Sequence, residues 1–189
     1  MKIVLASGSP RRLELLKMVG IGDFKVIADT SDEIITPGLS PEEQVIKLSL
    51  KKARNVSASR NKDDIIIAAD TLVYLEDEPL GKPESPEDAG KMLKKLSGHK
   101  HSVYTGVTLL RGNKHISKAE KTDVFFREIS ADEIKSYVQT GEPMDKAGSY
   151  AAQGGAAVFI KRIEGDFFNV MGLPLCRLSK MLKEFGVTI

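Results

Sequence analysis

Charged residues of the types that phosphate and metal chemistry needs recur through this sequence. They are Arg11, Arg12, Asp32, Glu33, Lys52, Asp70 and Lys82. Carboxylates can hold Mg²⁺ through one or two ligands while substrate phosphates supply others, and arginine and lysine offset the charge of a polyphosphate. Taken together, these residues predict a metal and phosphate site. The alternative is that each is a solvated or capping residue of the surface, which is the commoner fate of such side chains.

The arginine pair stands at the start of a predicted helix. Residues 3–6 are a short apolar run typical of a strand, residues 7–9 are turn-forming, and Pro10 opens the helix. With Ser9 as N-cap, the arginines occupy the second and third helical positions, where the helix dipole disfavours cations. An anion held there by backbone N–H groups, the Ser7 and Ser9 hydroxyls and both guanidinium groups would explain them. The alternative is an exposed turn whose arginines point into water.

Asp70 follows a continuous apolar run at residues 65–69, which is short and rich in isoleucine. Such a run is typical of a strand covered on both faces, and we expect it to be the central strand. Asp70 and Thr71 would then stand at the carboxyl end of that strand. Open α/β sheets usually place their chemistry at this end.

The other elements alternate between strand and helix. The expected strands are 3–6, 24–28, 65–69, 71–80, 101–110, 117–127 and 157–163, and the expected helices are 10–19, 40–59, 85–97, 130–141 and 175–185. The serines at 40, 85 and 130 are predicted N-caps. Lys51 and Lys52 lie on adjacent faces of their helix, so only one should face a site. The pattern predicts one α/β domain over residues 1–189, with a mixed sheet in two lobes and a cleft between them.

Composition narrows the functional classes. The net charge is +2 and the basic residues are scattered, which argues against a nucleic-acid surface. No apolar window approaches the ~20 residues of a membrane span, so we expect a soluble, cytoplasmic protein. The single Cys176 cannot form an internal disulfide and is expected to fill the core. His99 and His101 are expected at the surface or in a hairpin, without a zinc site.

Glycine and alanine are dense in residues 145–174. So much glycine near a strand favours close approach of the backbone to a ligand. Tight turns are the alternative. They would explain the glycines but not the polar residues Asp145, Lys146 and Gln153 among them.

The sequence closely resembles the Maf family of nucleoside triphosphate pyrophosphatases, from end to end. The matching segments are LASGSPRRLELL, SDE (31–33), LKKA (50–53), AADT (68–71), LGKP (80–83), LSGHKHSVYTGV, EPMDKAGSYAAQG and VMGLPL. The resemblance implies a Maf/inosine-triphosphatase-like α/β fold, with a mixed, elongated sheet flanked by helices. It also implies hydrolysis of a nucleoside triphosphate to the monophosphate and pyrophosphate, with Mg²⁺ or Mn²⁺, in a nucleotide house-cleaning role.

Within the family, the segments SPRR, ADT and QG resemble the branch that acts on dTTP and UTP. Modified pyrimidine nucleotides are further candidate substrates. The branch acting on 7-methyl-GTP is similar but has a bulky residue between the proline and the arginine pair, and another residue in place of Gln153. Ala68 or Ala69 replaces a common glycine, and Ala152 a common isoleucine, which bears only on details of base preference.

The resemblance also assigns roles to residues. The proton acceptor is Asp70, which shares the metal with Glu33. The specificity positions are Arg11, Thr71 and Gln153. The residues around the phosphates are Ser7, Ser9, Arg12, Lys52 and Lys82. The implied mechanism is attack of a metal-associated water on the α-phosphorus, with Asp70 taking the proton. The expected partner is the nucleotide alone, without nucleic acid or membrane, and a homodimer is left open.

A protein of another class is the alternative: a nucleotide-binding regulator of septum formation that binds a polyphosphate without turning it over. Asp70 separates the two hypotheses. A carboxylate beside an anionic ligand gives a binding protein little, whereas a hydrolase needs one as a base.

Overall fold

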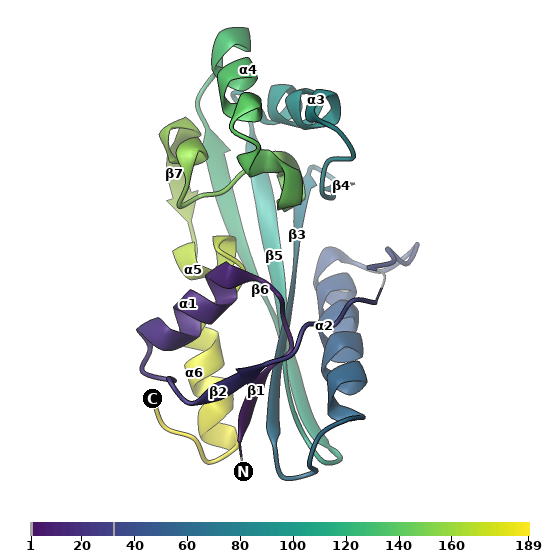
Figure 1. Ribbon diagram of the computed structural model, residues 1–189. Helices are drawn as coiled ribbons and strands as arrows, with labels where there is room; N and C mark the ends of the chain where they lie inside the picture. Colours follow the sequence, from purple (N-terminus) through teal and green to yellow (C-terminus); the bar gives the residue numbers. More distant parts are fainter. Residues whose placement is uncertain (1, 32) are drawn as a thin grey trace. The chain divides into compact units, whose positions relative to one another are not determined.

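The computed structural model describes residues 2–31 and 33–189 (Figure 1). Asp32, one of the carboxylates of the predicted metal and phosphate site, lies outside the described residues. In chain order the elements are β1 (Ile3–Leu5), α1 (Pro10–Met18), β2 (Phe24–Val26), α2 (Pro41–Ser57), β3 (Ile65–Leu75), β4 (Glu78–Leu80), α3 (Pro86–Leu96), β5 (Lys100–Arg111), β6 (Lys114–Phe126), α4 (Ala131–Gln139), η1 (Glu142–Asp145), η2 (Ala147–Ser149), η3 (Gly155–Phe159), β7 (Ile160–Glu164), α5 (Phe167–Val170) and α6 (Leu175–Glu184).

The strands of the described chain form one seven-stranded sheet in the order β2-β1-β3-β5-β6-β7, with β4 paired to β3. β1 is parallel to both β2 and β3, whereas β4 is antiparallel to β3 and β7 antiparallel to β6. The sheet is therefore mixed, as predicted. The sequence predicted separate strands at 65–69 and 71–80, whereas the structure has one continuous strand, β3, that runs through Asp70 to Leu75 and pairs with β4.

The contacts between residues divide the chain into two compact units. Unit 1 comprises Met1–Asp70, Thr105–Glu120 and Gly172–Ile189, and unit 2 comprises Thr71–Tyr104 and Lys121–Met171. Unit 1 holds β1, β2, α1, α2 and α6, and unit 2 holds β4, α3, α4, β7 and α5. The chain passes from one unit to the other within β3, β5 and β6 and again between Met171 and Gly172.

In unit 1, α2 lies on one side of the strands, and α1 and α6 lie on the other (Figure 1). Ser40 caps α2 through a capping box with Glu43, as the sequence predicts. The helix approaches β5 so closely that a Cβ atom built on Gly106 would lie 2.2 Å from the Val45 carbonyl oxygen. A glycine is therefore required at this position, since any side chain would push the helix away from the strand.

Unit 2 has its own hydrophobic core, to which α4, β5 and the segment before β7 contribute aromatic rings. Tyr137 packs edge-to-face on Phe159, and Phe126 packs edge-to-face on Tyr150. His101 joins this cluster with its ring edge-on to Phe126 and Tyr150, and it is 1% exposed. Of the two predicted places for His101, the hairpin is correct, since His101 lies on β5 of the β5–β6 hairpin, but the surface is not, because this position of β5 faces the aromatic core.

Three further expectations need correction. Cys176 is exposed rather than part of the core, because the buried side of α6 starts one position earlier at Leu175. The strand expected from residue 157 begins only at Ile160, because η3 occupies residues 155–159. The short helix α5, which Asp166 caps, was not predicted.

Candidate active site

Unit 1 brings Lys52, Glu33 and Asp70 into direct contact. The Lys52 ammonium lies 2.5 Å from Asp70 Oδ1 and 2.5 Å from Glu33 Oε1. Asp70 is 1% exposed and Lys52 8%, whereas the Glu33 side chain is 38% exposed. The predicted metal carboxylates and a predicted phosphate lysine thus form one cluster, in which the Lys52 ammonium contacts both carboxylates.

Asp70 has the electrostatics of a proton acceptor. Its second oxygen, Oδ2, is buried and has no hydrogen-bond partner among the described residues. Burial raises the pKa of the Asp70 carboxyl, and Glu33 raises it further, although Lys52 and Arg12 pull it down. The ionised carboxylate is therefore more basic than an aspartate in water, and its unpartnered oxygen can accept a proton.

Asp70 lies on β3 beyond the point where the neighbouring strand β1 ends. β1 ends at Leu5, which stands opposite Ile67 of β3, and the Ala6 N–H donates to the Ile67 carbonyl at 2.8 Å. Asp70 lies three residues farther along β3, beyond the paired part of β1. Asp70 therefore stands beyond the end of a neighbouring parallel strand, not at the end of its own strand as the sequence predicted.

Lys52 reaches Asp70 because α2 is fixed against β5. Besides the approach of Gly106 to the helix backbone, the Ser49 hydroxyl lies 2.9 Å from the Thr108 hydroxyl in the buried interface. Lys52 stands three residues after Ser49 on the same helix, hence on the face that meets the sheet. Its neighbour Lys51 is partly exposed, so only one lysine of the pair faces the carboxylates, as predicted.

The opening turn holds Arg12 by contacts within unit 1. Arg12 Nε donates to the Gly172 carbonyl at 2.8 Å, and Nη1 donates to the Ser7 hydroxyl at 3.1 Å. The Ser9 N–H donates to the same Ser7 oxygen at 3.2 Å. The buried Ser7 therefore shapes the turn and holds the guanidinium at once.

Ser9 is the N-cap residue of α1, which places Arg11 and Arg12 at the second and third helical positions, as predicted. In the described chain the Ser9 side chain makes no capping hydrogen bond. Burial lowers the pKa of the Arg12 guanidinium below its ordinary value, whereas Asp70 and Glu33 oppose this shift. Although the residue keeps some exposure, the guanidinium is enclosed, and its electrostatic coupling to both carboxylates assigns it to their cluster.

The other predicted residues belong to unit 2. Thr71 directly follows Asp70 on β3 and is partly exposed. Lys82 is exposed in the loop after β4, where the preceding Gly81 carbonyl accepts a hydrogen bond from the Gly148 N–H at 3.0 Å. Gln153 is exposed in a turn farther along the segment that contains Gly148. The structure thus links the loop of Lys82 to the segment that leads to Gln153.

The carboxylate pair has the donors that a hard divalent cation uses. Groups of three or more histidine, cysteine or acidic side chains suited to a metal are absent from the part of the chain that the structure describes. Mg²⁺ is commonly held by one or two carboxylates together with substrate phosphates and water. Glu33 and the unpartnered Oδ2 of Asp70 fit that pattern.

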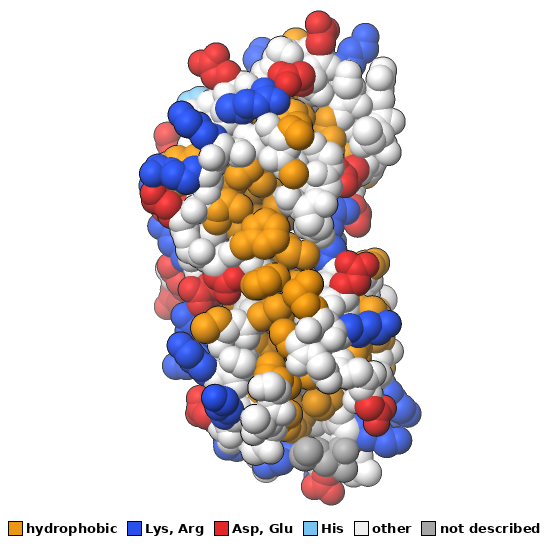
Figure 2. All heavy atoms as spheres, turned by 90° about the vertical axis from the view of Figure 1, so that its left-hand side faces the viewer, with side chains coloured by type: hydrophobic (Ala, Val, Ile, Leu, Met, Phe, Trp, Pro, Cys, Tyr) orange, Lys and Arg blue, Asp and Glu red, His pale blue; other side chains and the backbone are white. Residues whose placement is uncertain are grey.

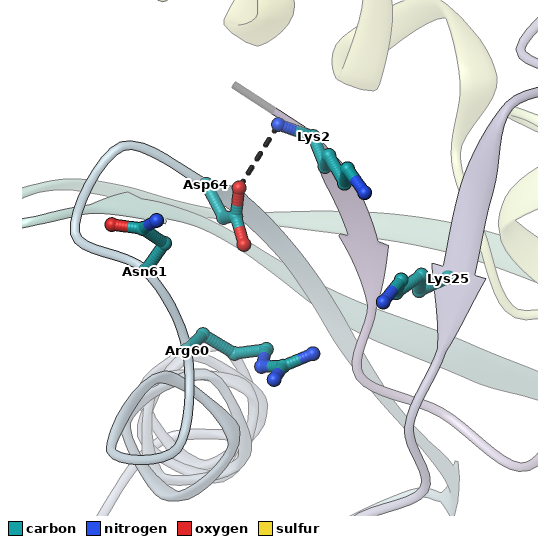
Figure 3. A pocket seen from close by; sticks show the side chains of 5 residues that line it. All are labelled: Lys2, Lys25, Arg60, Asn61 and Asp64. Carbon is teal, nitrogen blue, oxygen red and sulfur yellow. Dashed lines mark hydrogen bonds between the residues drawn. The ribbon is translucent and has the colours of Figure 1, made fainter.

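Unit 1 also has a basic hollow of about 370 Å³, apart from the Asp70 cluster (Figure 3). Its lining residues are Lys2, Lys25, Arg60, Asn61 and Asp64. The Lys2 backbone N–H donates to Asp64 Oδ1 at 3.0 Å, the bond drawn in Figure 3. Six residues of extended chain separate Asp64 from Asp70, which is about 20 Å. The hollow therefore lies at the other end of β3, and no predicted site residue lines it.

The face shown in Figure 2 has no simple charge pattern. On the face shown in Figure 2, basic and acidic side chains are interspersed around exposed hydrophobic ones. Of the helices in the described ranges, none combines the length and the apolar character that a membrane crossing requires.

Two contacts of the cluster were not predicted. The Gly172 carbonyl that fixes Arg12 comes from a segment 160 residues away, and the only signal was the match of VMGLPL to the Maf pattern. The pairing of Lys52 with both carboxylates was also missed, since the lysine had been assigned to phosphate alone. Neither contact follows from local sequence, because both depend on how distant segments pack.

Similarity to solved structures shows the class of fold. The chain is similar to the structure of a HAM1 protein from Coxiella burnetii, with 19% identity, a TM-score of 0.53, and coverage of 97% of this chain and 99% of the other. It is also similar to the Ham1 protein of Staphylococcus aureus, with 16% identity, a TM-score of 0.51, and coverage of 98% and 100%. The predicted Maf/inosine-triphosphatase-like α/β fold is confirmed.

The family follows from sequence. The family described as "Maf-like protein" matches residues 2–185. A dTTP/UTP pyrophosphatase of Methanosarcina mazei is 52% identical over all of this chain and 96% of its own length, and one of Bacillus cereus is 45% identical over all of this chain and 97% of its own. This chain belongs to the Maf family, as the sequence motifs indicated.

Proposed function

We propose that this chain is a nucleotide pyrophosphatase that hydrolyses dTTP and UTP to the monophosphate and pyrophosphate, in a nucleotide house-cleaning role. The names of the full-length relatives in Methanosarcina and Bacillus support the reaction and the substrates. The observation that carries the proposal is the buried Asp70 carboxylate, whose Oδ2 lacks a partner among the described residues and whose pKa is raised.

In the proposed reaction a water molecule attacks the α-phosphorus, and Asp70 Oδ2 takes its proton. The bond between the α-phosphorus and the bridging oxygen breaks, and pyrophosphate leaves with the electron pair. General-base assistance contributes about 10²- to 10⁴-fold, so stabilisation of phosphoryl charge must supply most of the rate. Arg12 and Lys52 are the proposed cations for this task in unit 1, with the turn of Ser7 and Ser9.

A divalent cation is part of the proposal, and Glu33 and Asp70 are the residues that would hold it. When bound, such a cation supplies positive charge to the phosphates. The choice between Mg²⁺ and Mn²⁺ is left to the assay. In unit 2, the proposed roles are phosphate binding for Lys82 and base selection for Thr71 and Gln153, with Arg11 of unit 1 as the third specificity residue.

The alternative of a septum regulator without turnover is not favoured. The matched relatives are named as pyrophosphatases. A protein that only binds a polyphosphate would also gain nothing from a buried carboxylate with one oxygen, Oδ2, left without a partner among the described residues, because its negative charge repels an anionic ligand.

The test is a pyrophosphate-release assay of the purified chain with UTP, dTTP, CTP and GTP, each with Mg²⁺ and with Mn²⁺. We expect UTP and dTTP to have the highest kcat/KM, and Asp70→Asn to abolish most of the release. If none of the nucleotides releases pyrophosphate although binding is measurable, the hydrolase proposal is wrong.

A further inference from the structure

Two side chains of unit 2, those of Tyr137 and Glu142, hold the backbone on either side of the turn that carries Gln153. The Gly154 N–H donates to the Ala151 carbonyl at 3.0 Å and closes the turn. Gln153 itself is exposed, whereas its neighbours Ala151 and Ala152 are buried. The glutamine side chain therefore projects from a backbone whose flanks are anchored.

Tyr137 anchors the residue before the turn. The Ala151 N–H donates to Tyr137 Oη at 3.2 Å in a buried contact. The Tyr137 ring is held in turn by Phe159, with ring centroids 5.5 Å apart at 89°. The phenol oxygen is thus presented to the turn by a fixed ring of the core.

Glu142 anchors the residue after the turn. The Gly155 N–H donates to Glu142 Oε2 at 2.9 Å. A Cβ atom built on Gly154 would lie 1.8 Å from Glu142 Oε1. Glycine at position 154 is therefore what allows the carboxylate to reach the turn.

These anchors fix where the Gln153 side chain leaves the backbone, and so where its amide, which carries an oxygen acceptor and NH₂ donors, can meet a base. Uracil and cytosine present reversed donor and acceptor patterns, so a mobile glutamine could serve either. We propose that Tyr137 and Glu142 are positioning residues that set the preference for uracil and thymine over cytosine by fixing the Gln153 turn. The inference rests on the proposed base-reading role of Gln153.

The first experiment compares Tyr137→Phe and Glu142→Ala with the wild type by the ratio of kcat/KM for UTP to that for CTP. Tyr137→Phe keeps the ring on Phe159 and removes only the acceptor oxygen. Each variant should lower the ratio about 2- to 10-fold, the effect of one net hydrogen bond. Glu142→Gln keeps an acceptor oxygen and should restore the ratio.

The matched control is Glu87→Ala, which removes an exposed carboxylate paired with Lys91 on α3 of the same unit. It should leave the ratio unchanged. A purely structural role of Tyr137 or Glu142 would lower the melting temperature and reduce both kcat/KM values equally. An unchanged ratio in both variants therefore overturns the inference.

Gly154→Ala gives an independent test, because its methyl group should displace the Glu142 carboxylate. It should lower the ratio alone and have no further effect in the Glu142→Ala background, since the displaced group is already gone. Additive effects of the two substitutions would contradict the proposed contact.

Measurements on Gln153→Ala distinguish a failure of this inference from a failure of the proposed function. If Gln153→Ala lowers the ratio and Tyr137→Phe adds nothing to it, the positioning role is supported. If Gln153→Ala lowers the ratio but Tyr137→Phe and Glu142→Ala do not, the inference fails and the base-reading role stands. If Gln153→Ala leaves the ratio unchanged while pyrophosphate is still released, base reading by Gln153 and the inference both fail, but the hydrolase proposal does not.

Discussion

The Lys52 ammonium lies 2.5 Å from Asp70 Oδ1 and forms an ion pair with a carboxylate that is 1% exposed. The same ammonium also contacts Glu33. It therefore both neutralises the proposed base and separates it from a second negative charge. This double role makes the basicity of Asp70 depend on a residue of another element.

Lys52→Met should raise the pKa of Asp70 further, because the positive charge that lowers it is lost while Glu33 and burial still raise it. The acidic limb of the kcat/KM profile for UTP should move to higher pH. A shift of one pKa unit costs about 10-fold in rate wherever the base is mostly protonated. Lys51→Met is the matched control and should leave the limb in place. An unmoved limb in Lys52→Met would show that this lysine does not tune the base.

Asp70→Asn should lower kcat by about 10²- to 10⁴-fold, because the amide cannot take a proton from water. Its shape is nearly the same, so the fold should survive. Asp64→Asn, at the start of the same strand, is the control and should keep its activity. Near-normal turnover in a folded Asp70→Asn protein would remove Asp70 from the role of base.

The same substitution should stabilise the protein at alkaline pH. Because the folded-state pKa of Asp70 is raised above the ordinary 3.8, the folded state binds this proton more tightly than the unfolded state, and the ionised form opposes folding above that pKa. Asp70→Asn should therefore raise the melting temperature at pH 8, by about 2–4 °C for each kcal/mol gained. The gain should shrink as the pH falls toward 4. A gain in melting temperature that grows on acidification would contradict a raised pKa of Asp70.

Arg12→Ala should weaken binding and turnover for every nucleotide alike, since the guanidinium is proposed to meet phosphate rather than base. Loss of a charged hydrogen bond predicts about a 10- to 150-fold fall in kcat/KM, with an unchanged ratio of UTP to CTP. Arg12→Lys should recover only part of the lost kcat/KM, because one ammonium cannot hold Ser7 and Gly172 in the geometry of the guanidinium. Arg54→Ala is the exposed control. A change in melting temperature alone would refute the anion site of the opening turn.

Gln153→Ala should lower the UTP rate more than the CTP rate and so narrow the gap between them. A site built to hydrogen-bond a base rejects a mismatched one because its own polar groups are left unpaired. The measurement is kcat/KM for UTP, dTTP, CTP and GTP in both proteins. Gln139→Ala, an exposed glutamine of α4 in the same unit, is the control. Equal losses for UTP and CTP would return Gln153 to the status of a turn residue.

His101 should make the stability of unit 2 sensitive to acid. Burial lowers the pKa of His101 to about 4, so the unfolded chain takes up its proton first, and stability falls between pH 6.5 and 4. The loss should be on the order of 3 kcal/mol. His101→Phe should lack this part of the pH dependence in urea unfolding at pH 7, 5.5 and 4.5. His99→Phe, at an exposed position, should keep the wild-type dependence, and identical curves for all three proteins would refute the assignment.

The fold could be predicted largely where local signals fix it. Ser40, Ser85 and Ser130 cap their helices through side-chain hydrogen bonds, as the sequence indicated, because a cap depends on residues three apart. The length of β3 and the burial of His101 were missed. Both depend on partners far away in the sequence, which periodicity does not reveal.

In the candidate site, too, the features that local sequence fixes could be predicted, whereas those that depend on the packing of distant segments could not. The geometry of Asp70, Glu33 and Lys52 joins three separate segments; their residue types predicted a shared metal and phosphate site and the family resemblance supported it, but neither predicted which atoms meet. The raised pKa of Asp70 could not be predicted at all, since it depends on how completely the packed chain excludes water. Tyr137 was expected only as a helix residue, because sequence does not show which backbone group a buried phenol meets.

The close approach of Gly106 to the Val45 carbonyl fixes the height of α2 above the sheet, and with it the geometry of the site. Where a helix rests on a strand through its backbone, its height above the sheet no longer varies with the sizes of intervening side chains. Neutral exchanges of core residues elsewhere in unit 1 can then accumulate without lifting α2, and so without lengthening the 2.5 Å contact between Lys52 and Asp70. The absence of a single methyl group thus protects the alignment of the proposed base from drift in the surrounding core.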